Sequence, residues 1–236
     1  MRRTIALAVL GTVLACSAGC SWDPSTPLAR AAARGDLREM ESLLAQGADL
    51  EAADLRGLTP LIAAAREGQA DAARLLLRRG ADPNHTGGVN RWTPLEHAIH
   101  KGRNETGLIL LDAGRARGNG LDAPLIMAAA NGNAAMVRAL LAHGADPGAR
   151  DAGGFSALAG AVGGAWDIDY AFPGCEAHTE TVRALLDANP ALRLEDGKRD
   201  RAARRYAEKH RCVELLALVE GKGVHGAAEN ANAASR

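Results

Sequence analysis

Residues 59–82 read TPLIAAAREGQADAARLLLRRGAD, and most of the chain repeats this pattern. The motif Thr-Pro-Leu or a close variant opens each copy, at residues 26–28, 59–61, 93–95, 123–125 and 156–158. Gly-Ala-Asp follows later in three of the copies, at residues 47–49, 80–82 and 144–146. Successive copies begin 33, 34, 30 and 33 residues apart. A nearly constant period of this length predicts a solenoid of stacked structural units.

Each residue type in the repeat has a structural reason. Thr59 can cap a helix whose first position accepts Pro60, because the first amide of a helix has no partner inside the helix. The small residues that follow allow close packing between helices, and Gly68 can end the helix in a left-handed conformation. A second helix then carries paired leucines, and Gly80 closes it. The repeat therefore predicts two short helices joined by a turn and followed by an extended loop.

These motifs resemble the ankyrin repeat, which has the signature Thr-Pro-Leu-His-x-Ala and a period of about 33 residues. The resemblance covers residues 24–220 and implies an all-α ankyrin-repeat solenoid with five repeats and a degenerate C-terminal capping repeat. The units are expected at residues 24–54, 55–86, 87–117, 118–150, 151–194 and 195–220. Two departures stand out: no copy has His after Thr-Pro-Leu, and residues 114–117 read GRAR where Gly-Ala-Asp is expected.

The composition argues against several classes of protein. Aromatic residues make up only 3% of the chain, whereas all-β folds rely on aromatic and β-branched side chains. The 28 basic and 28 acidic residues balance, whereas a nucleic-acid-binding protein normally has a basic surplus. The chain contains no Walker loop, His-Glu-x-x-His motif or Gly-x-Ser-x-Gly motif. We therefore expect no nucleic acid partner, no cofactor and no enzyme activity.

Residues 1–20 have the pattern of an export signal. A positive start precedes an apolar run, residues 4–15, that is too short to span a bilayer comfortably. The end of this run resembles the lipobox of bacterial lipoproteins, with Cys16 or Cys20 as the lipid acceptor. We favour Cys16 because it directly follows the apolar run. Cleavage without lipidation and an uncleaved anchor are the alternatives, and all of them place the domain outside the cytoplasm, on the periplasmic side of the envelope.

Two more cysteines and an insertion distinguish the C-terminal units. Cys175 and Cys212 favour a disulfide in an exported protein, and two buried thiols are the alternative. The fifth unit is longer than the fourth, so we expect an insertion at about residues 164–178. Its aromatic residues Trp166, Tyr170 and Phe172 form either a protruding recognition loop or a local core over the stack. The tail, residues 221–236, lacks periodicity and is expected to be disordered.

The resemblance also implies a concave binding face made of finger loops and first helices. Leu58, Trp92 and Phe155 each precede the capping Thr or Ser of a unit, and we interpret these bulky apolar side chains as contact residues. The other candidates for partner contact are Arg56, Arg66, His97, His100 and Met127. The spacing of His97 and His100 can seat two metal ligands, but no third ligand is evident, so we interpret both as surface histidines that bind no metal.

Together these patterns predict a monomeric, non-catalytic protein that binds another protein through the concave face and the insertion. One specific version is an inhibitor or immunity protein of a toxin or of a cell-wall enzyme, which is an argument by analogy. The alternatives are a metal-binding or enzymatic envelope protein that uses His97 and His100, and an envelope spacer without a tight partner.

Overall fold

The computed structural model describes residues 26–114, 118–164, 175–195 and 197–220. Within these ranges the regular secondary structure is helical, with one short 3-10 helix, η1 (Gly118–Leu121). The α-helices are α1 (Pro27–Arg34), α2 (Leu37–Ala45), α3 (Pro60–Glu67), α4 (Ala70–Arg78), α5 (Pro94–His100), α6 (Asn104–Ala113), α7 (Asp122–Ala130), α8 (Ala134–Ala142), α9 (Ala157–Gly163), α10 (Cys175–Ala188), α11 (Lys198–Lys209) and α12 (Val213–Val219). No helix in the described ranges has both the length and the apolar character needed to cross a membrane.

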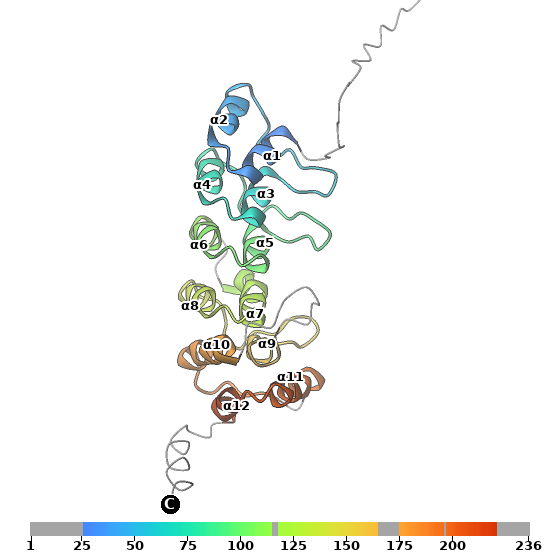
Figure 1. The fold of residues 1–236 in the computed structure, drawn as a ribbon, viewed down its shortest axis with the longest axis vertical. Helices are drawn as coiled ribbons and strands as arrows, with labels where there is room; N and C mark the ends of the chain where they lie inside the picture. Colours follow the sequence, from blue (N-terminus) through green and yellow to red (C-terminus); the bar gives the residue numbers. More distant parts are fainter. Residues whose placement is uncertain (1–25, 115–117, 165–174, 196, 221–236) are drawn as a thin grey trace, which may run out of the picture.

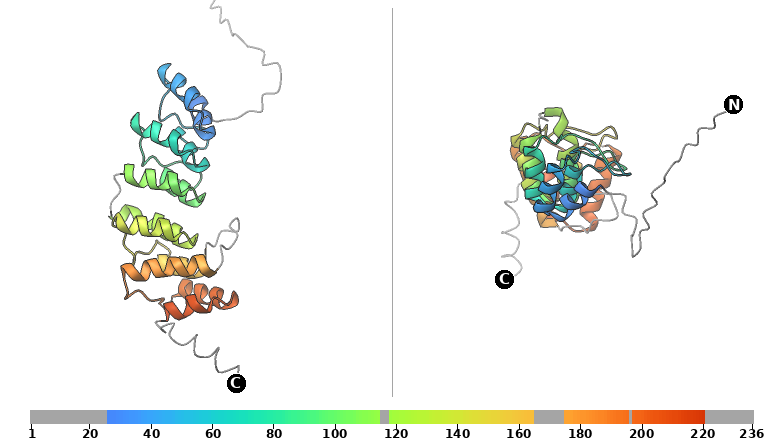
Figure 2. Two further views of the ribbon diagram at one scale, coloured as in Figure 1. Left: turned by 60° about the vertical axis from the view of Figure 1, so that its left-hand side comes forward. Right: turned by 90° about the horizontal axis from the view of Figure 1, so that it is seen from above.

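The α-helices pack in two rows (Figure 1). The odd-numbered helices, which are the first helices of each pair, contact one another from α1 to α11, and the even-numbered helices do the same from α2 to α12. Figure 2 shows that the pairs stack along one direction, so that each pair lies between its neighbours in sequence. The predicted fold class, an all-helical solenoid of stacked helix pairs, is confirmed.

The capping residues predicted from the repeat start most of the first helices. Thr26, Thr59 and Thr93 each accept a hydrogen bond from the amide three residues later, at 3.2, 3.4 and 3.3 Å. Ser156 caps α9 in the same way, at 3.1 Å. The fourth unit differs, because α7 begins at Asp122 directly after η1 and has no side-chain cap. Local capping therefore fixes where four of the first helices begin.

Small side chains bring the first helices close together. The alanine pairs at 31–32, 64–65 and 128–129 have no exposed surface. Between α7 and α9 the contact is closer still, since a Cβ atom on Gly160 would lie 3.2 Å from the backbone nitrogen of Ala130. These faces are buried only by the neighbouring unit, so each unit depends on the next for its stability.

Side chains from the turns between the two helices of a pair join consecutive units to one another. Each donates a hydrogen bond to a carbonyl near the end of the first helix of the preceding unit. Three such bonds, all 3.2 Å long, connect Gln69 to Ala33, Arg103 to Arg66, and Asn131 to Ile99. They satisfy carbonyl groups that the end of a helix leaves without a partner inside that helix.

Helix α10 begins inside the region expected for the insertion. We expected the insertion to extend over residues 164–178, but Cys175 already starts α10, so residues 175–178 form helix and not loop. His178 on this turn has no exposed surface, and its Nδ1 donates a hydrogen bond of 2.8 Å to the carbonyl oxygen of Ala161 in α9. The C-terminal end of the insertion therefore packs onto the stack.

A disulfide joins Cys175, at the start of α10, to Cys212, immediately before α12. The two Cα atoms are 5.4 Å apart and the cysteines are separated by 37 residues in the sequence. The structure thus contains the pairing favoured by the sequence, and this bond links the fifth helix pair to the capping pair.

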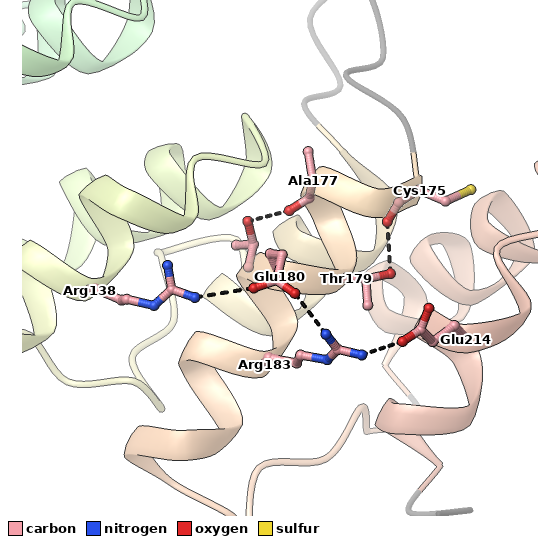
Figure 3. A network of polar contacts seen from close by, with 8 residues as sticks. Arg138, Cys175, Ala177, Thr179, Glu180, Arg183 and Glu214 are labelled. Carbon is pink, nitrogen blue, oxygen red and sulfur yellow. Dashed lines mark hydrogen bonds and ion pairs between the residues drawn. The ribbon is translucent and has the colours of Figure 1, made fainter. Parts of the chain in front are cut away.

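An ion-pair network crosses the last three helices of the second row (Figure 3). Glu180 of α10 contacts Arg138 of α8 at 3.3 Å and Arg183 of its own helix at 2.7 Å. Arg183 also pairs with Glu214 of α12. All four side chains are between 43% and 55% exposed, and exposed pairs contribute little each. The network therefore adds a small, salt-sensitive term to the stacking of these units.

Candidate protein-binding surface

The finger loops before α3 and α9 share one conformation, set by an aspartate. In finger 1, residues 54–58, Asp54 Oδ1 accepts the amides of Arg56 and Leu58 at 2.8 and 2.9 Å. The Asp54 amide in turn donates to the Leu58 carbonyl at 3.0 Å. Residues 151–155 repeat this arrangement, with Asp151 Oδ1 accepting the amides of residues 153 and 155, both at 2.8 Å. The side-chain oxygen thus replaces water as the partner of the turn amides.

The loop before α5, finger 2 (residues 87–92), is hydrogen-bonded to finger 1. The amide of Gly88 donates to the carbonyl of Arg56 at 3.0 Å. Gly87 lies so close that a Cβ atom on it would be 2.0 Å from the carbonyl oxygen of Gly57. Only glycine fits at this position, because any side chain would separate the two loops. Fingers 1 and 2 therefore form one connected platform that projects beyond the first-helix row (Figure 1).

Two of the three bulky finger residues are buried, contrary to our interpretation of them as presented contact residues. Leu58 is 5% exposed and Phe155 is 7% exposed. The hydrogen bonds to Asp54 and Asp151 turn the loop back at these positions. Leu58 then lies against Gly88 of finger 2, and Phe155 joins the hydrophobic core with Arg199 of α11 5.7 Å from its ring centroid. The interpretation of Leu58 and Phe155 as presented contact residues was therefore wrong, since both side chains are buried at the base of their fingers.

Trp92 packs finger 2 against α5. Its ring is half-buried, with ring centroids 5.5 Å from His97 and 4.7 Å from His100. The Nε2 atom of His97 donates to the carbonyl oxygen of Gly87 at 3.3 Å, which ties the start of the finger to the helix. These aromatic contacts hold the finger in place, and the remaining exposed part of Trp92 is available to a partner.

His97 is only 7% exposed, so the interpretation of it as a surface histidine was wrong. Burial lowers the pKa of His97, the hydrogen bond to Gly87 opposes this effect, and the positive charge of Arg66 adds to it. At neutral pH the His97 ring is therefore uncharged, and its Nε2 atom is already bonded to the carbonyl oxygen of Gly87. In the described part of the chain, no three His, Cys, Asp or Glu side chains come together in a way that could hold a metal ion.

A groove of about 260 Å³ lies below finger 1, between α1 and α3. Small alanines of both helices line it together with the charged side chains Arg30, Arg34, Arg56, Arg66, Asp54 and Glu67. Two of these, Arg56 and Arg66, are candidates named from the sequence, and the fold places them in one groove. Met127 lies further along the first-helix row, half-buried in α7.

Other candidates lie outside the described residues. These are the insertion residues Trp166, Tyr170 and Phe172 and the proposed lipid acceptors Cys16 and Cys20. The expected tail, residues 221–236, also lies outside them.

Sequence reasoning missed the two exposed aliphatic residues at the finger tips. Leu55 is 79% exposed and Val89 is 96% exposed. An alignment of residues 54–58 (DLRGL) with residues 151–155 (DAGGF) could have found Leu55, because the shared Asp and Gly mark the turn and leave Leu55 at its tip.

The structure defines the class of protein as an α-helical repeat protein with an elongated surface of projecting loops, an architecture that serves binding. The family model described as "Ankyrin repeats (3 copies)" matches residues 8–87, 28–119 and 85–151. The chain belongs to the ankyrin-repeat family. Ankyrin repeats generally mediate protein–protein interaction and are typically non-enzymatic.

Several known proteins are similar to parts of this chain. "Ankyrin repeat and SOCS box protein 16" of Homo sapiens is 36% identical over 180 residues, which is 74% of this chain and 38% of that protein. A "Putative ankyrin repeat-containing protein" of Treponema pallidum is 33% identical over 107 residues, covering 44% of this chain and 36% of that protein. Human "Cyclin-dependent kinase inhibitor 2A" is 38% identical over 99 residues, covering 42% of this chain and 63% of that protein. The chain thus spans less than two thirds of each of these relatives.

Proposed function

We propose that this chain is an exported, non-enzymatic protein that binds another protein on the finger loops and first helices. One observation carries the proposal: fingers 1 and 2 are hydrogen-bonded to each other, through Gly88 and Arg56, and present exposed aliphatic tips beside a groove. A loop platform that is ordered before binding loses little conformational entropy when a partner docks. Exposed apolar side chains on such a platform are typical of an interaction site.

Export is supported by two independent features. The first is the signal-like pattern of residues 1–20, with lipid attachment at Cys16 (or Cys20). The second is the disulfide between Cys175 and Cys212, because disulfides persist in oxidising compartments and are rare in the reducing cytosol. An N-terminal lipid would hold the stack at the envelope, on the periplasmic side, while leaving the finger platform open to a protein partner.

The specific version that we favour is an inhibitor or immunity protein that masks a toxin or a cell-wall enzyme. Its support is an analogy: two relatives named as cyclin-dependent kinase inhibitors are 38% identical to this chain over 99 and 87 residues. A stack of this kind can block an enzyme by covering it without performing any reaction. The metal-dependent alternative loses its basis, because His97 is buried and its Nε2 contacts Gly87.

Site-specific photo-crosslinking in the source organism tests the proposal. A photoreactive amino acid at Leu55 or Val89 is expected to give a discrete crosslinked protein, because both tips are exposed on the platform. The same amino acid at Leu108 in the second-helix row, which is 43% exposed, is the matched control. Crosslinks from neither finger would refute the binding function and leave the envelope spacer as the explanation. Mass spectrometry of the mature amino terminus separately tests lipidation at Cys16 or Cys20.

A further inference from the structure

The groove below finger 1 concentrates basic side chains on a chain that is neutral as a whole. Four arginines and two carboxylates line it, whereas the complete sequence has 28 residues of each sign. Asp54 is buried, with a side chain only 2% exposed, and pairs with Arg56 at 3.0 Å, while Arg34 pairs with Glu39 at the edge of the groove. The four arginines of the groove outnumber Asp54, Glu67 and the adjacent Glu39, so the groove carries a small excess of positive charge.

Asp54 also positions Arg56. Its Oδ2 accepts from the Arg56 Nε at 3.1 Å and contacts a terminal guanidinium nitrogen at 3.0 Å, while its Oδ1 holds the turn amides. The Arg56 side chain is nevertheless 55% exposed. A guanidinium fixed by a buried carboxylate has less freedom to lose on binding, and its planar fork suits a second carboxylate.

Arg66 supplies a second positive charge from α3. It is half-buried, and its guanidinium makes no ion pair within the part of the chain that the structure describes. Its charge reaches the next unit, because it helps to lower the pKa of His97. A cation that lines a groove and has no internal counter-ion favours an anionic ligand group at that position.

The finger tips add an apolar element directly beside this charge. Leu55 precedes Arg56 in the chain, and Val89 follows Gly88, whose amide donates to the Arg56 carbonyl at 3.0 Å. The two tips are the most exposed of the large hydrophobic side chains in the described residues, at 79% and 96%. A ligand that covers them also lies next to Arg56.

We propose that the surface formed by fingers 1 and 2 and the groove between α1 and α3 binds an acidic segment of a partner protein. The carboxylates of that segment pair with Arg56 and Arg66, and an aliphatic or aromatic side chain among them packs on Leu55 and Val89. This assignment rests on the proposed function and specifies the chemistry of the partner. Charge complementarity with the groove selects an acidic segment, and the exposed tips require that it also be apolar.

Selection from a library of random displayed peptides on the full chain tests the assignment. The wild type is expected to enrich peptides that combine Asp or Glu with a large apolar residue. The variant Arg66→Glu is expected to bind these selected peptides about tenfold more weakly, and so is the double variant Leu55→Ser/Val89→Ser. The matched control Arg78→Glu reverses an exposed arginine in the second-helix row and is expected to leave binding unchanged. Circular dichroism and thermal unfolding confirm that each variant is folded.

The outcomes separate this inference from the function on which it rests. Enriched peptides without an acidic surplus, the absence of any enriched peptide, or equal binding by the wild type and Arg66→Glu would overturn the acidic-segment assignment. If crosslinks from Leu55 and Val89 in cells persist in that case, the binding function stands with a partner of different chemistry. If those crosslinks are also absent, both proposals fail.

Discussion

His97 Nε2 lies 3.3 Å from the carbonyl oxygen of Gly87, so one buried imidazole ties finger 2 to the helix that follows it. The pKa of His97 is lowered, chiefly because burial disfavours the charged ring. The pKa of His178 is lowered for the same reason. Both rings therefore remain neutral in the folded chain at a pH where the same two histidines begin to bind protons in the unfolded chain.

This arrangement predicts a loss of stability on mild acidification. An unfolded histidine protonates near pH 6.5, so below this value the unfolded chain binds more protons than the folded one. The free energy of unfolding is then expected to fall as the pH drops from about 7 to about 5.5. His97→Gln should reduce this dependence, and His178, whose pKa is also lowered, should maintain part of it. Urea unfolding measured at several pH values gives the free energy of unfolding as a function of pH for the wild type and for His97→Gln. If this free energy changes with pH equally in both proteins, the prediction is wrong.

The contact between Gly87 and Gly57 predicts that Gly87→Ala disrupts the finger platform. The added Cβ would meet the Gly57 carbonyl oxygen at 2.0 Å, a backbone atom that cannot yield without moving finger 1. We expect a loss of about 1–3 kcal/mol in the free energy of unfolding, together with weaker capture of the partner. Gly197→Ala is the control, because nothing lies within 4 Å of that position. Thermal unfolding of the two variants should differ clearly.

Arg211 takes the place of a glycine at the end of the first helix of the last pair. Its φ of 55° is left-handed, like that of Gly35 and Gly68 at the same point in their units. A side chain with a Cβ is strained there, so Arg211→Gly is expected to stabilise the chain by about 1 kcal/mol. Arg205→Gly, at an exposed position inside α11, should destabilise it by a similar amount. Opposite shifts in melting temperature are the expected result, and shifts of the same sign would be evidence against backbone strain at Arg211.

The disulfide predicts that reduction weakens the C-terminal end of the stack selectively. Opening a bond that spans 37 residues of sequence removes a constraint on the unfolded chain that amounts to about 4 kcal/mol in the chain-entropy model. Hydrogen exchange should accelerate in α11 and α12 on reduction, with little change in α1 to α4, since distant units are coupled only through their neighbours. A Cys175→Ser/Cys212→Ser double variant should not respond to the reductant. Uniform acceleration along the chain would contradict this prediction.

The ion-pair network of Figure 3 is expected to contribute little to stability. Glu180→Gln removes the charge that contacts both Arg138 and Arg183, yet the cost should stay below about 1 kcal/mol, because the groups are partly exposed. The difference from the wild type should shrink further at about 1 M salt, where the Debye length is about 3 Å. Glu176→Gln on the same helix, at an exposed position, is the control. If Glu180→Gln instead lowers the free energy of unfolding by several kcal/mol at every salt concentration, the network matters more than we expect.

The sequence alone determined the helix pairs and their order. A fixed period, a capping Thr and a terminal Gly are local signals, because caps and turns involve residues only a few positions apart, and so helix α3 could be placed from residues 59–68. The fold class followed from the same pattern, since no single unit can bury its own apolar face.

Only the tertiary structure decided which side chains of the binding surface are exposed. Leu58 and Leu55 lie in the same loop and are equally apolar, yet Leu58 is 5% exposed and Leu55 is 79% exposed. The turn around Asp54 and the approach of finger 2 from the next unit separate them. Burial at these positions depends on contacts between residues about one repeat apart, and a local pattern does not contain that information. The same holds for His97, which lies on a first helix like its neighbours but is covered by Trp92 and Gly87 of the adjoining loop.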